Sequence, residues 1–240
     1  MYFIDSHIHL QDFNKDFALK VLDDEKALKL VVVSAKEEDF DKVAELMDKY
    51  KDKVVGAFGI HPWYAKNDFK YAKLEELLIK YPNALVGEIG FDGIKQKVDF
   101  RQQMAFETQL CLAKRYNRPV ILHGAKAFVA LKKYENELRE LKYVYHGFTR
   151  NREIIKFINK TNGYFGLGKM FLRQKEAKNL ISEMPFDRIL FETDAPFQIV
   201  GKNYLNQRES CLENLVNLVD DFEGNFGEQL IHNALEFIKC

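Results

Sequence analysis

Two histidines near the start of the chain have the spacing of metal ligands. His7 and His9 stand in the segment Asp5-Ser-His-Ile-His-Leu10, after a short apolar run. Side chains two residues apart in an extended segment point to the same side, so both imidazoles could reach one ion at ~2.0–2.1 Å. An HxH pair also arises by chance, and this spacing alone leaves open a surface role for one of the two.

Three more of the six histidines stand at or just beyond the ends of apolar segments. His123 follows Val120-Ile-Leu122, and His146 follows Val144-Tyr145. Singly, each could be a core histidine with a hydrogen-bond partner, but as a matched pair on adjacent predicted strands they favour metal binding. His61 is expected to contact substrate, or to support a ligand, rather than to bind metal.

Two carboxylates complete this pattern. Glu88 is expected at the tip of a buried strand, where a carboxylate is costly to desolvate unless a cation or hydrogen bonds hold it. An ion pair with a lysine or arginine inside the fold is the alternative. Asp194 directly follows another apolar segment and could serve both as a metal ligand and as the acceptor of a water's proton. Asp92 is expected to orient a ligand histidine or a loop amide.

Together these residues predict a site for one or two divalent cations. The expected ligands are His7, His9, Glu88, His123, His146 and Asp194. Glu88 could bridge two ions, and a pair ~3.5–4 Å apart would activate water and stabilise the charge on phosphoryl oxygens. We expect Asp194 and Glu88 to be the catalytic carboxylates. The imidazoles favour Zn²⁺, whereas phosphoryl chemistry with carboxylates often uses Mg²⁺ or Mn²⁺.

The elements that would position these residues alternate along the chain. Short apolar segments are followed by longer segments of helical periodicity about eight times. The predicted strands are Tyr2–Asp5, Lys29–Ser34, Val54–Gly59, Ala84–Ile89, Pro119–Leu122, Tyr143–His146, Tyr164–Leu167 and Arg188–Glu192. The predicted helices include Glu37–Lys51, Lys73–Lys80, Phe100–Tyr116 and Arg152–Lys160, with Asn206–Asp221 and Phe226–Lys239 covering the outside and bottom.

This alternation predicts an α/β fold, a single-domain TIM barrel over residues 1–240. A barrel gathers the carboxyl ends of all its strands on one face, so residues far apart in sequence would meet there. An open doubly wound sheet is the alternative, but the chain has no glycine-rich nucleotide-binding motif. At two helix starts, Ser34 with Glu37 and Asp99 with Gln102 predict capping boxes.

The composition of the chain limits the substrates and the cell compartments that we expect. The 36 basic and 36 acidic residues cancel, so a nucleic-acid substrate would need a local basic rim. The three cysteines form no CxxC pair, which argues against a thiolate zinc site and suits a reducing compartment. The first residues lack a signal-peptide pattern and the apolar runs are too short to cross a membrane. We expect a cytoplasmic protein without an evident obligate protein partner.

In these motifs the sequence resembles the TatD family of metal-dependent hydrolases, also called TatD-like deoxyribonucleases. The resemblance covers nearly the whole chain, through Asp5–Leu10, Gly59–Pro62, Gly87–Asp92, Pro119–His123, Glu192–Pro196 and His232–Phe237. It implies a distorted TIM barrel with a one- or two-metal site. His7 and His9 would hold the first metal with Asp194, Glu88 would bridge, and the histidines at 123 and 146 would hold the second.

The chain departs from the family pattern at three places. Gly124-Ala-Lys126 stands where the family has Ser-Arg-acid, and Thr149-Arg150 follows Gly147-Phe148 where the family has a glycine. The family's Arg-Asn-Glu-Pro appears only as Gln207-Arg-Glu-Ser210. Arginines commonly clamp phosphates. The expected substrate contacts are therefore His61, Lys126, Arg150 and Arg208.

The sequence thus favours a hydrolase that cleaves phosphodiesters, and DNA in particular, with a metal-activated water whose proton Asp194 accepts. The neutral charge and the missing arginine favour an alternative, a hydrolase of the same fold that acts on a small ester, lactone or amide. A metal-binding protein without catalysis is the second alternative.

Overall fold

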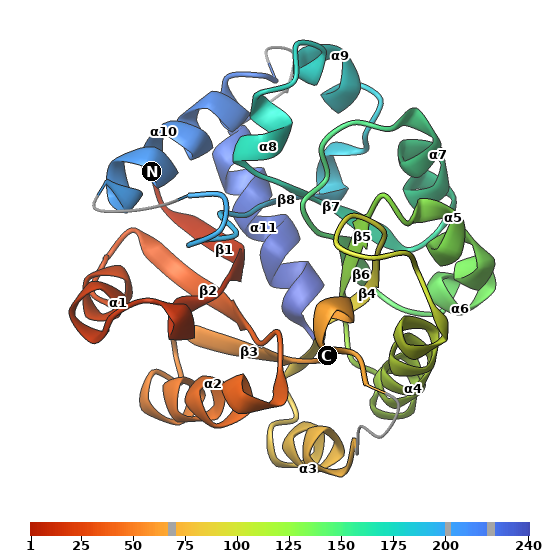
Figure 1. Cartoon of the computed structure of the whole chain (residues 1–240). Coiled ribbons are helices and arrows are strands. Elements are labelled where there is room, and N and C mark those ends of the chain that lie inside the picture. Colours follow the sequence, from red (N-terminus) through yellow and green to blue (C-terminus); the bar gives the residue numbers. More distant parts are fainter. Residues whose placement is uncertain (67–70, 200–202, 220–223) are drawn as a thin grey trace.

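Eight parallel strands form one sheet in chain order (Figure 1). The computed structural model describes residues 1–66, 71–199, 203–219 and 224–240. The strands are β1 (Phe3–Ile8), β2 (Ala27–Val33), β3 (Val54–Phe58), β4 (Leu85–Asp92), β5 (Val120–Ala125), β6 (Tyr143–Tyr145), β7 (Gly163–Leu167) and β8 (Ile189–Phe191). A parallel bridge between Ile8 and Ala195 brings the first and last strands together. The result is a nearly closed TIM barrel, as the alternation of segments predicts.

Helices surround the strands. They are α1 (Lys15–Leu22), α2 (Glu37–Lys49), α3 (Ala72–Lys80), α4 (Phe100–Tyr116), α5 (Phe128–Leu131), α6 (Glu135–Arg139), α7 (Arg152–Lys160), α8 (Lys169–Leu172), α9 (Ala177–Ile181), α10 (Tyr204–Val216) and α11 (Phe226–Ile238). The helix expected over Asn206–Asp221 begins two residues earlier and ends at Val216, five residues before its expected end, and Asp220 and Asp221 lie outside the described ranges. Within those ranges, no helix is long and apolar enough to span a membrane.

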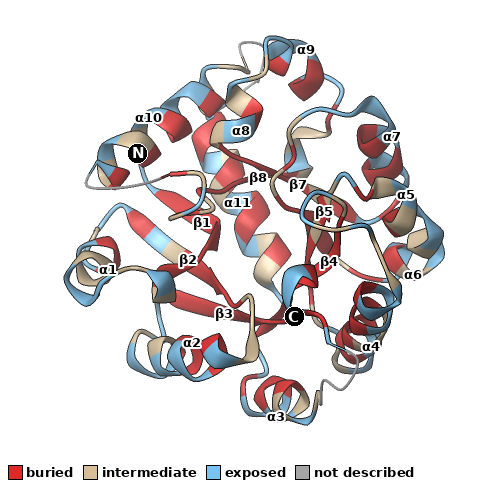
Figure 2. Cartoon of the chain, in the orientation of Figure 1, coloured by how far each residue is buried: buried red, intermediate tan, exposed pale blue. Residues whose placement is uncertain are grey.

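The apolar core has two layers, one on each face of the sheet. Along β2, Val31 and Val33 belong to the inner cluster, whereas Leu30 and Val32 pack in the outer cluster with the surrounding helices. Strands buried on both faces read as continuous apolar runs, which is why they stand out in the sequence. Figure 2 shows the strands buried and the helices buried mainly on the side that faces them.

Helix α11 closes the bottom of the barrel. Its Ala234 and Phe237 pack in the inner cluster with side chains from the strands, and in Figure 1 the helix lies across the middle of the ring of strands. Full burial of one such phenylalanine stabilises the fold by ~1.5–3 kcal/mol. This plug leaves the other end of the barrel, where the strands' carboxyl ends lie, for polar residues.

Three strands run further than the sequence predicts. Strands β1, β4 and β5 each extend three residues past their expected ends, so that His7 and His123 lie inside strands, as Glu88 was expected to. The strands β4 and β5 stay paired as far as Asp92 and Ala125. The predicted ends were wrong because they took Ser6, Gly90 and His123 as the starts of loops, whereas the backbone stays paired beyond them.

Neither predicted capping box forms in full. Ser34 does not cap α2, because its hydroxyl accepts from Gly59 N at 2.9 Å and also lies 3.1 Å from Gly59 O, which joins the ends of β2 and β3. Instead, Asp39 accepts from two backbone amides that precede the helix. Asp99 does cap α4, and its Oδ1 accepts from the amide of Gln102 at 3.1 Å. The side chain of Gln102, which would complete this second box, instead bonds the backbone of Asp92.

A buried carboxylate holds the seam between the first and last strands. Asp5 is fully buried, and it accepts from Thr193 Oγ1 at 2.6 Å, from Thr193 N at 3.0 Å and from His7 N at 3.2 Å. Burial raises the pKa of Asp5 to about 7, against the opposing effect of these hydrogen bonds. Ser6 adds a bond to Phe191 O at 2.9 Å. The seam therefore places His7 next to the segment that carries Asp194.

We predict that Asp5→Ala lowers the free energy of unfolding by about 2–4 kcal/mol, because each buried donor left without a partner costs ~1–3 kcal/mol. Asp5→Asn should lose less than half as much, since its carbonyl can still accept from both amides and its amide can donate to the Thr193 hydroxyl. Urea denaturation of both variants measures the difference. Equal losses in the two would show that these hydrogen bonds do not hold the seam.

Candidate metal centre

The carboxyl ends of five strands bring the six predicted ligands together. His7 and His9 come from the end of β1, Glu88 from β4 and His123 from β5, while His146 directly follows β6 and Asp194 lies three residues after β8. Four of these residues are at least nine-tenths buried, namely His7, His9, Glu88 and His146. The side chain of Asp194 is 13% exposed. Of the two carboxylates among the six predicted ligands, it is therefore the one that solvent or a substrate can reach from the mouth, the open end of the barrel where the strands' carboxyl ends lie.

The first cluster contains both histidines of the HxH pair. His7 Nε2 and His9 Nε2 lie 3.1 Å apart. Each lies 3.6–3.8 Å from Glu88 Oε2 and from Asp194 Oδ1. Atoms that each sit ~2.0–2.1 Å from a shared ion in tetrahedral geometry are separated by ~3.3–3.4 Å. These four atoms therefore fit around one cation.

The second cluster faces the other oxygen of the same carboxylate. Glu88 Oε1 lies 2.7 Å from His123 Nδ1, 3.0 Å from His146 Nε2 and 3.8 Å from His61 Nε2. One carboxylate oxygen thus points to each cluster, which is the arrangement of a bridging ligand. His61, which the sequence places among substrate contacts, lies close enough to Glu88 and His123 to share an ion with them.

A further carboxylate lies beside each of two of these histidines, and the one beside His123 is hydrogen-bonded to it. Asp92 Oδ2 lies 2.9 Å from His123 Nε2, so that Nδ1 faces Glu88, as expected for a carboxylate that orients a ligand. Glu192 Oε1 lies 3.5 Å from His146 Nδ1 and accepts from the amide of Gly147 at 2.6 Å. Glu192 is not among the residues that the sequence predicts for the site, although its position two residues before Asp194 is a signal that could have identified it.

Two glycines make room for these contacts. A Cβ on Gly166 would lie 2.1 Å from Glu192 Oε2, so a side chain there would displace that carboxylate. Gly90 has φ +144° and a Cβ on it would lie 2.0 Å from His123 O. Only glycine fits that backbone conformation at such close approach.

The ionisation of the buried side chains in the centre favours binding of a cation. Burial alone would raise the pKa of Glu88, but His146, His61 and His123 outweigh it and lower that pKa well below its ordinary value. The pKa of His146 is raised because Glu88 and Glu192 outweigh its burial. Burial lowers the pKa of His61 to about 3 and that of His7 well below its ordinary value, so both stay neutral. Ionised Glu88 beside neutral His7 is a donor set that a divalent cation binds, whereas a cation at the second cluster would have to displace the proton that Glu88 and Glu192 favour on His146.

Asp194 is fixed in the left-handed region of backbone space, with φ +45°, a conformation that aspartate tolerates better than most residues. Its amide donates to His7 O at 2.9 Å, and its Oδ2 accepts from Gln198 Nε2 at 3.0 Å. Its Oδ1 faces the first cluster. Burial raises its pKa, while His146 and His9 oppose the rise. This carboxylate can therefore bind a cation through one oxygen and take up a proton more readily than an exposed aspartate.

Two of the expected substrate contacts lie on the same face as the centre. Lys126 is exposed just beyond the end of β5, three residues after His123. Arg150 is exposed four residues after His146 and lines a cleft of about 540 Å³ with Arg152, Arg173 and Lys175, among others.

Arg208 does not join them. The guanidinium is buried on α10, where its Nη2 lies 2.8 Å from Asp24 Oδ2 and its carbon lies 4.2 Å from the ring centre of Phe3. Both partners belong to the end of the barrel where β1 and β2 begin. The expectation that Arg208 contacts substrate is therefore wrong, because this arginine stabilises the opposite end of the fold.

The barrel and its centre define a class of protein, the metal-dependent hydrolases. A sequence model of the family described as TatD related DNase matches residues 4–239. This chain belongs to that family.

The chain is also similar to individual proteins of this kind. The uncharacterized metal-dependent hydrolase YabD of Bacillus subtilis is 30% identical over 206 residues, 80% of each chain. Deoxyribonuclease TATDN3 of Homo sapiens is 27% identical over 218 residues, 80% of this chain and 77% of the relative. The crystal structure of YjjV, a TatD homolog from Escherichia coli, matches with a TM-score of 0.80 and 26% identity over 98% of this chain and 97% of its own.

We predict that Asp92→Asn weakens binding of the second cation by ~10–100-fold. The amide would donate toward His123 Nε2, which would force the ring proton onto Nδ1, the atom that faces Glu88. Zinc titration of the whole protein against a chromophoric chelator measures the change. Asp99→Asn is the matched control. The asparagine keeps a carbonyl oxygen that can cap α4, and this position lies far from the centre. An unchanged second affinity in Asp92→Asn would mean that this carboxylate does not position His123.

Proposed function

We propose that this protein hydrolyses phosphodiester bonds, those of DNA in particular. The observation that carries the proposal is Glu88, whose two oxygens face two separate clusters of histidines. His7, His9 and Asp194 would hold one divalent cation with it, and His123 and His146, with His61 nearby, would hold the other. When bound, such a pair lowers the pKa of a water and neutralises charge on phosphoryl oxygens. The imidazoles favour Zn²⁺, with Mn²⁺ or Mg²⁺ as alternatives.

The four carboxylates of the site would have different roles in the reaction. Asp194 would take the proton of the attacking water, since it is the carboxylate that is reachable from the mouth and its pKa is raised toward the working pH. Gln198 holds the second oxygen of this residue in place. Glu88, buried and ionised, would keep its charge fixed between the two clusters throughout. Asp92 and Glu192 would hold the rings of His123 and His146 in the orientation that presents a nitrogen to Glu88.

Local positive charge at the mouth supports a polyanionic substrate over a small ester, lactone or amide. The chain has no net charge to attract nucleic acid, so contacts must come from individual cations. Lys126 and Arg150 are exposed on this face, and Arg173 and Lys175 add positive charge to the cleft beside Arg150, where Glu176 pairs with Arg152. That the human relative bears the name deoxyribonuclease also supports DNA. Three unpaired cysteines support the further proposal of a cytoplasmic setting.

We predict that Asp194→Asn lowers kcat for a phosphodiester by ~10²–10⁴-fold, because an amide cannot accept the water's proton. The Michaelis constant should change much less, since the cations and the mouth are retained. Asp187→Asn makes the same change at the exposed far end of β8 and should leave kcat unaltered. The assay compares single-stranded DNA, a generic phosphodiester and a generic carboxylic ester at measured metal content. Wild-type turnover of the ester alone would replace the proposed function with the small-molecule alternative.

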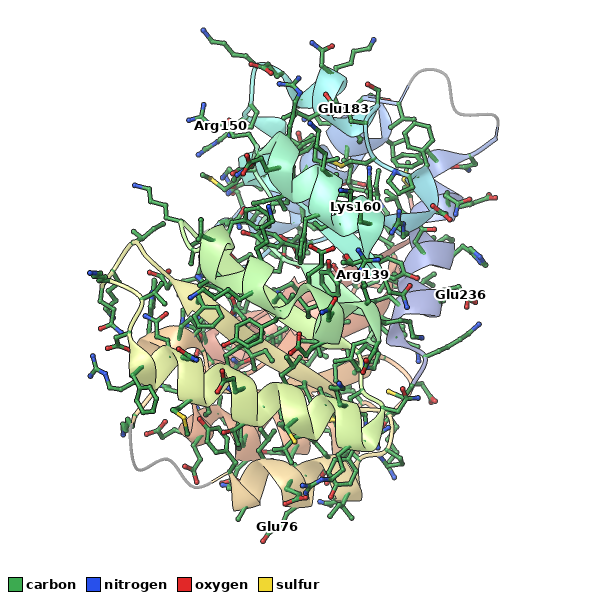
Figure 3. The ribbon with its side chains drawn as sticks, turned by 90° about the vertical axis from the view of Figure 1, so that its right-hand side faces the viewer. Glu76, Arg139, Arg150, Lys160, Glu183 and Glu236 are labelled. Carbon is green, nitrogen blue, oxygen red and sulfur yellow. The ribbon has the colours of Figure 1, made fainter. Side chains whose placement is uncertain are left out.

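We also predict that the double variant Lys126→Ala/Arg150→Ala raises the Michaelis constant for DNA and flattens its dependence on salt. Each lost phosphate contact should reduce the slope of log affinity against log salt by roughly 0.7–0.9. The matched control is Lys156→Ala/Lys160→Ala, which removes the same charge from exposed positions on α7. Figure 3 shows Arg150 and Lys160 at opposite ends of this helix. Equal salt slopes in the two double variants would exclude Lys126 and Arg150 as phosphate contacts.

A further inference from the structure

The single tryptophan of the chain lies beside the metal centre. Trp63 belongs to the 3-10 helix η2 (Pro62–Tyr64), directly after His61. Its ring centre lies 4.8 Å from that of His61, and its amide donates to His61 Nδ1 at 3.1 Å. On the indole, Lys95 Nζ lies 4.6 Å from the ring centre. A large aromatic face and a cation are thus joined next to a histidine that faces Glu88.

This tryptophan is not a core residue. It is 42% exposed, and its neighbour Tyr64 is 39% exposed. On the other side of the centre, Phe197 is 61% exposed while its ring lies 5.0 Å from that of His9. Exposed aromatic side chains that contact the buried histidines of a site are typical of ligand-binding surfaces rather than of packing. The proposed function uses none of these residues.

We propose that Trp63 and Lys95 form a nucleotide subsite, in which the indole stacks on an unpaired base while the lysine binds a phosphate of the same strand. The proposal rests on the proposed function, because it identifies the substrate of that site more closely. Stacking of a base on an aromatic side chain is stronger than an exposed cation–π contact. A base can therefore displace the Lys95 ammonium from the ring face. The ammonium is then free to bind the negatively charged phosphate.

Both halves of the subsite are fixed to the centre itself. Asp92 Oδ1 accepts from the amides of Ile94 and Lys95, each at 2.8 Å, while its other oxygen holds His123. Trp63 is likewise fixed by the bond from its amide to His61. A base held here would therefore keep a constant place relative to the reacting phosphate. Because the faces of bases in a duplex are covered by their neighbours, the subsite selects single strands and frayed ends.

The first test measures the fluorescence of Trp63. Because the chain has one tryptophan, selective excitation of tryptophan reports on this residue alone. The metal-loaded wild-type protein is titrated with a short single-stranded oligodeoxynucleotide whose phosphorothioate linkages resist hydrolysis. We expect saturable quenching by this oligomer and none by an abasic oligomer of the same length. Tyr2→Ala, which removes an exposed aromatic from the start of the chain, should be quenched as the wild type is. Equal quenching by the two oligomers, or none by either, would overturn the subsite.

The second test separates stacking from packing. Trp63→Leu keeps an apolar side chain against His61 but cannot stack, whereas Trp63→Phe retains an aromatic face. We expect Trp63→Leu to raise the Michaelis constant for the intact oligomer by roughly 5–100-fold, and Trp63→Phe by only a few-fold. The abasic oligomer should distinguish the two variants far less. Lys95→Ala should reduce the salt slope by about 0.7, the value for one contact to a single strand.

Two outcomes would overturn the subsite in these assays. Wild-type kinetics of Trp63→Leu on the intact oligomer would exclude stacking. An equal loss on intact and abasic oligomers would assign the indole only a supporting role beside His61, and elemental analysis would then show whether metal was lost. Neither outcome touches the proposed function, which depends on phosphodiester cleavage by the wild type and its loss in Asp194→Asn. Conversely, quenching is measured without cleavage and would stand if that function failed.

Discussion

The carboxylate of Glu88 is the constraint on which the site depends. It is buried and ionised, and its two oxygens face different groups of histidines. A carboxylate in such a place is stable only where positive charge or cations surround it. The extension of β4 to Asp92 and the glycines beside it bring this side chain into the middle of the mouth. The remaining ligands are arranged around it by the closure of the barrel.

Closure in turn depends on polar contacts at the seam. Asp5 binds Thr193 across the first and last strands, and the amide of Asp194 donates to His7 O. The apolar layers supply most of the stability, but they do not by themselves set the spacing between the HxH pair and Asp194. These hydrogen bonds do so, which connects the fold to the geometry of the first cluster. The plug of α11 at the opposite end keeps the centre on one face only.

The sequence predicts the order of the elements and the convergence of the six candidate ligands because both leave local signals. Buried parallel strands are continuous apolar runs, and histidines at their ends are rare enough to be noticed as a group. The ends of β1, β4 and β5 were mispredicted, because a polar side chain that faces a site, or a glycine within a strand, cannot be told from the start of a loop. Arg208 was misplaced for a related reason, since its pairing with Asp24 joins residues far apart in the chain. Glu192 and the exposed Trp63 likewise acquire their partners only in the folded barrel.

The central claim, that Glu88 is shared by two cation sites, is tested most directly by counting metal. Wild-type protein and Glu88→Ala would be dialysed together against one zinc buffer, and their content measured by elemental analysis, with cooperative unfolding as the check on folding. The wild type should carry up to two equivalents, and the variant should lose at least one of them, because both clusters lose a ligand at once. A folded Glu88→Ala protein with the wild-type metal content would contradict the account.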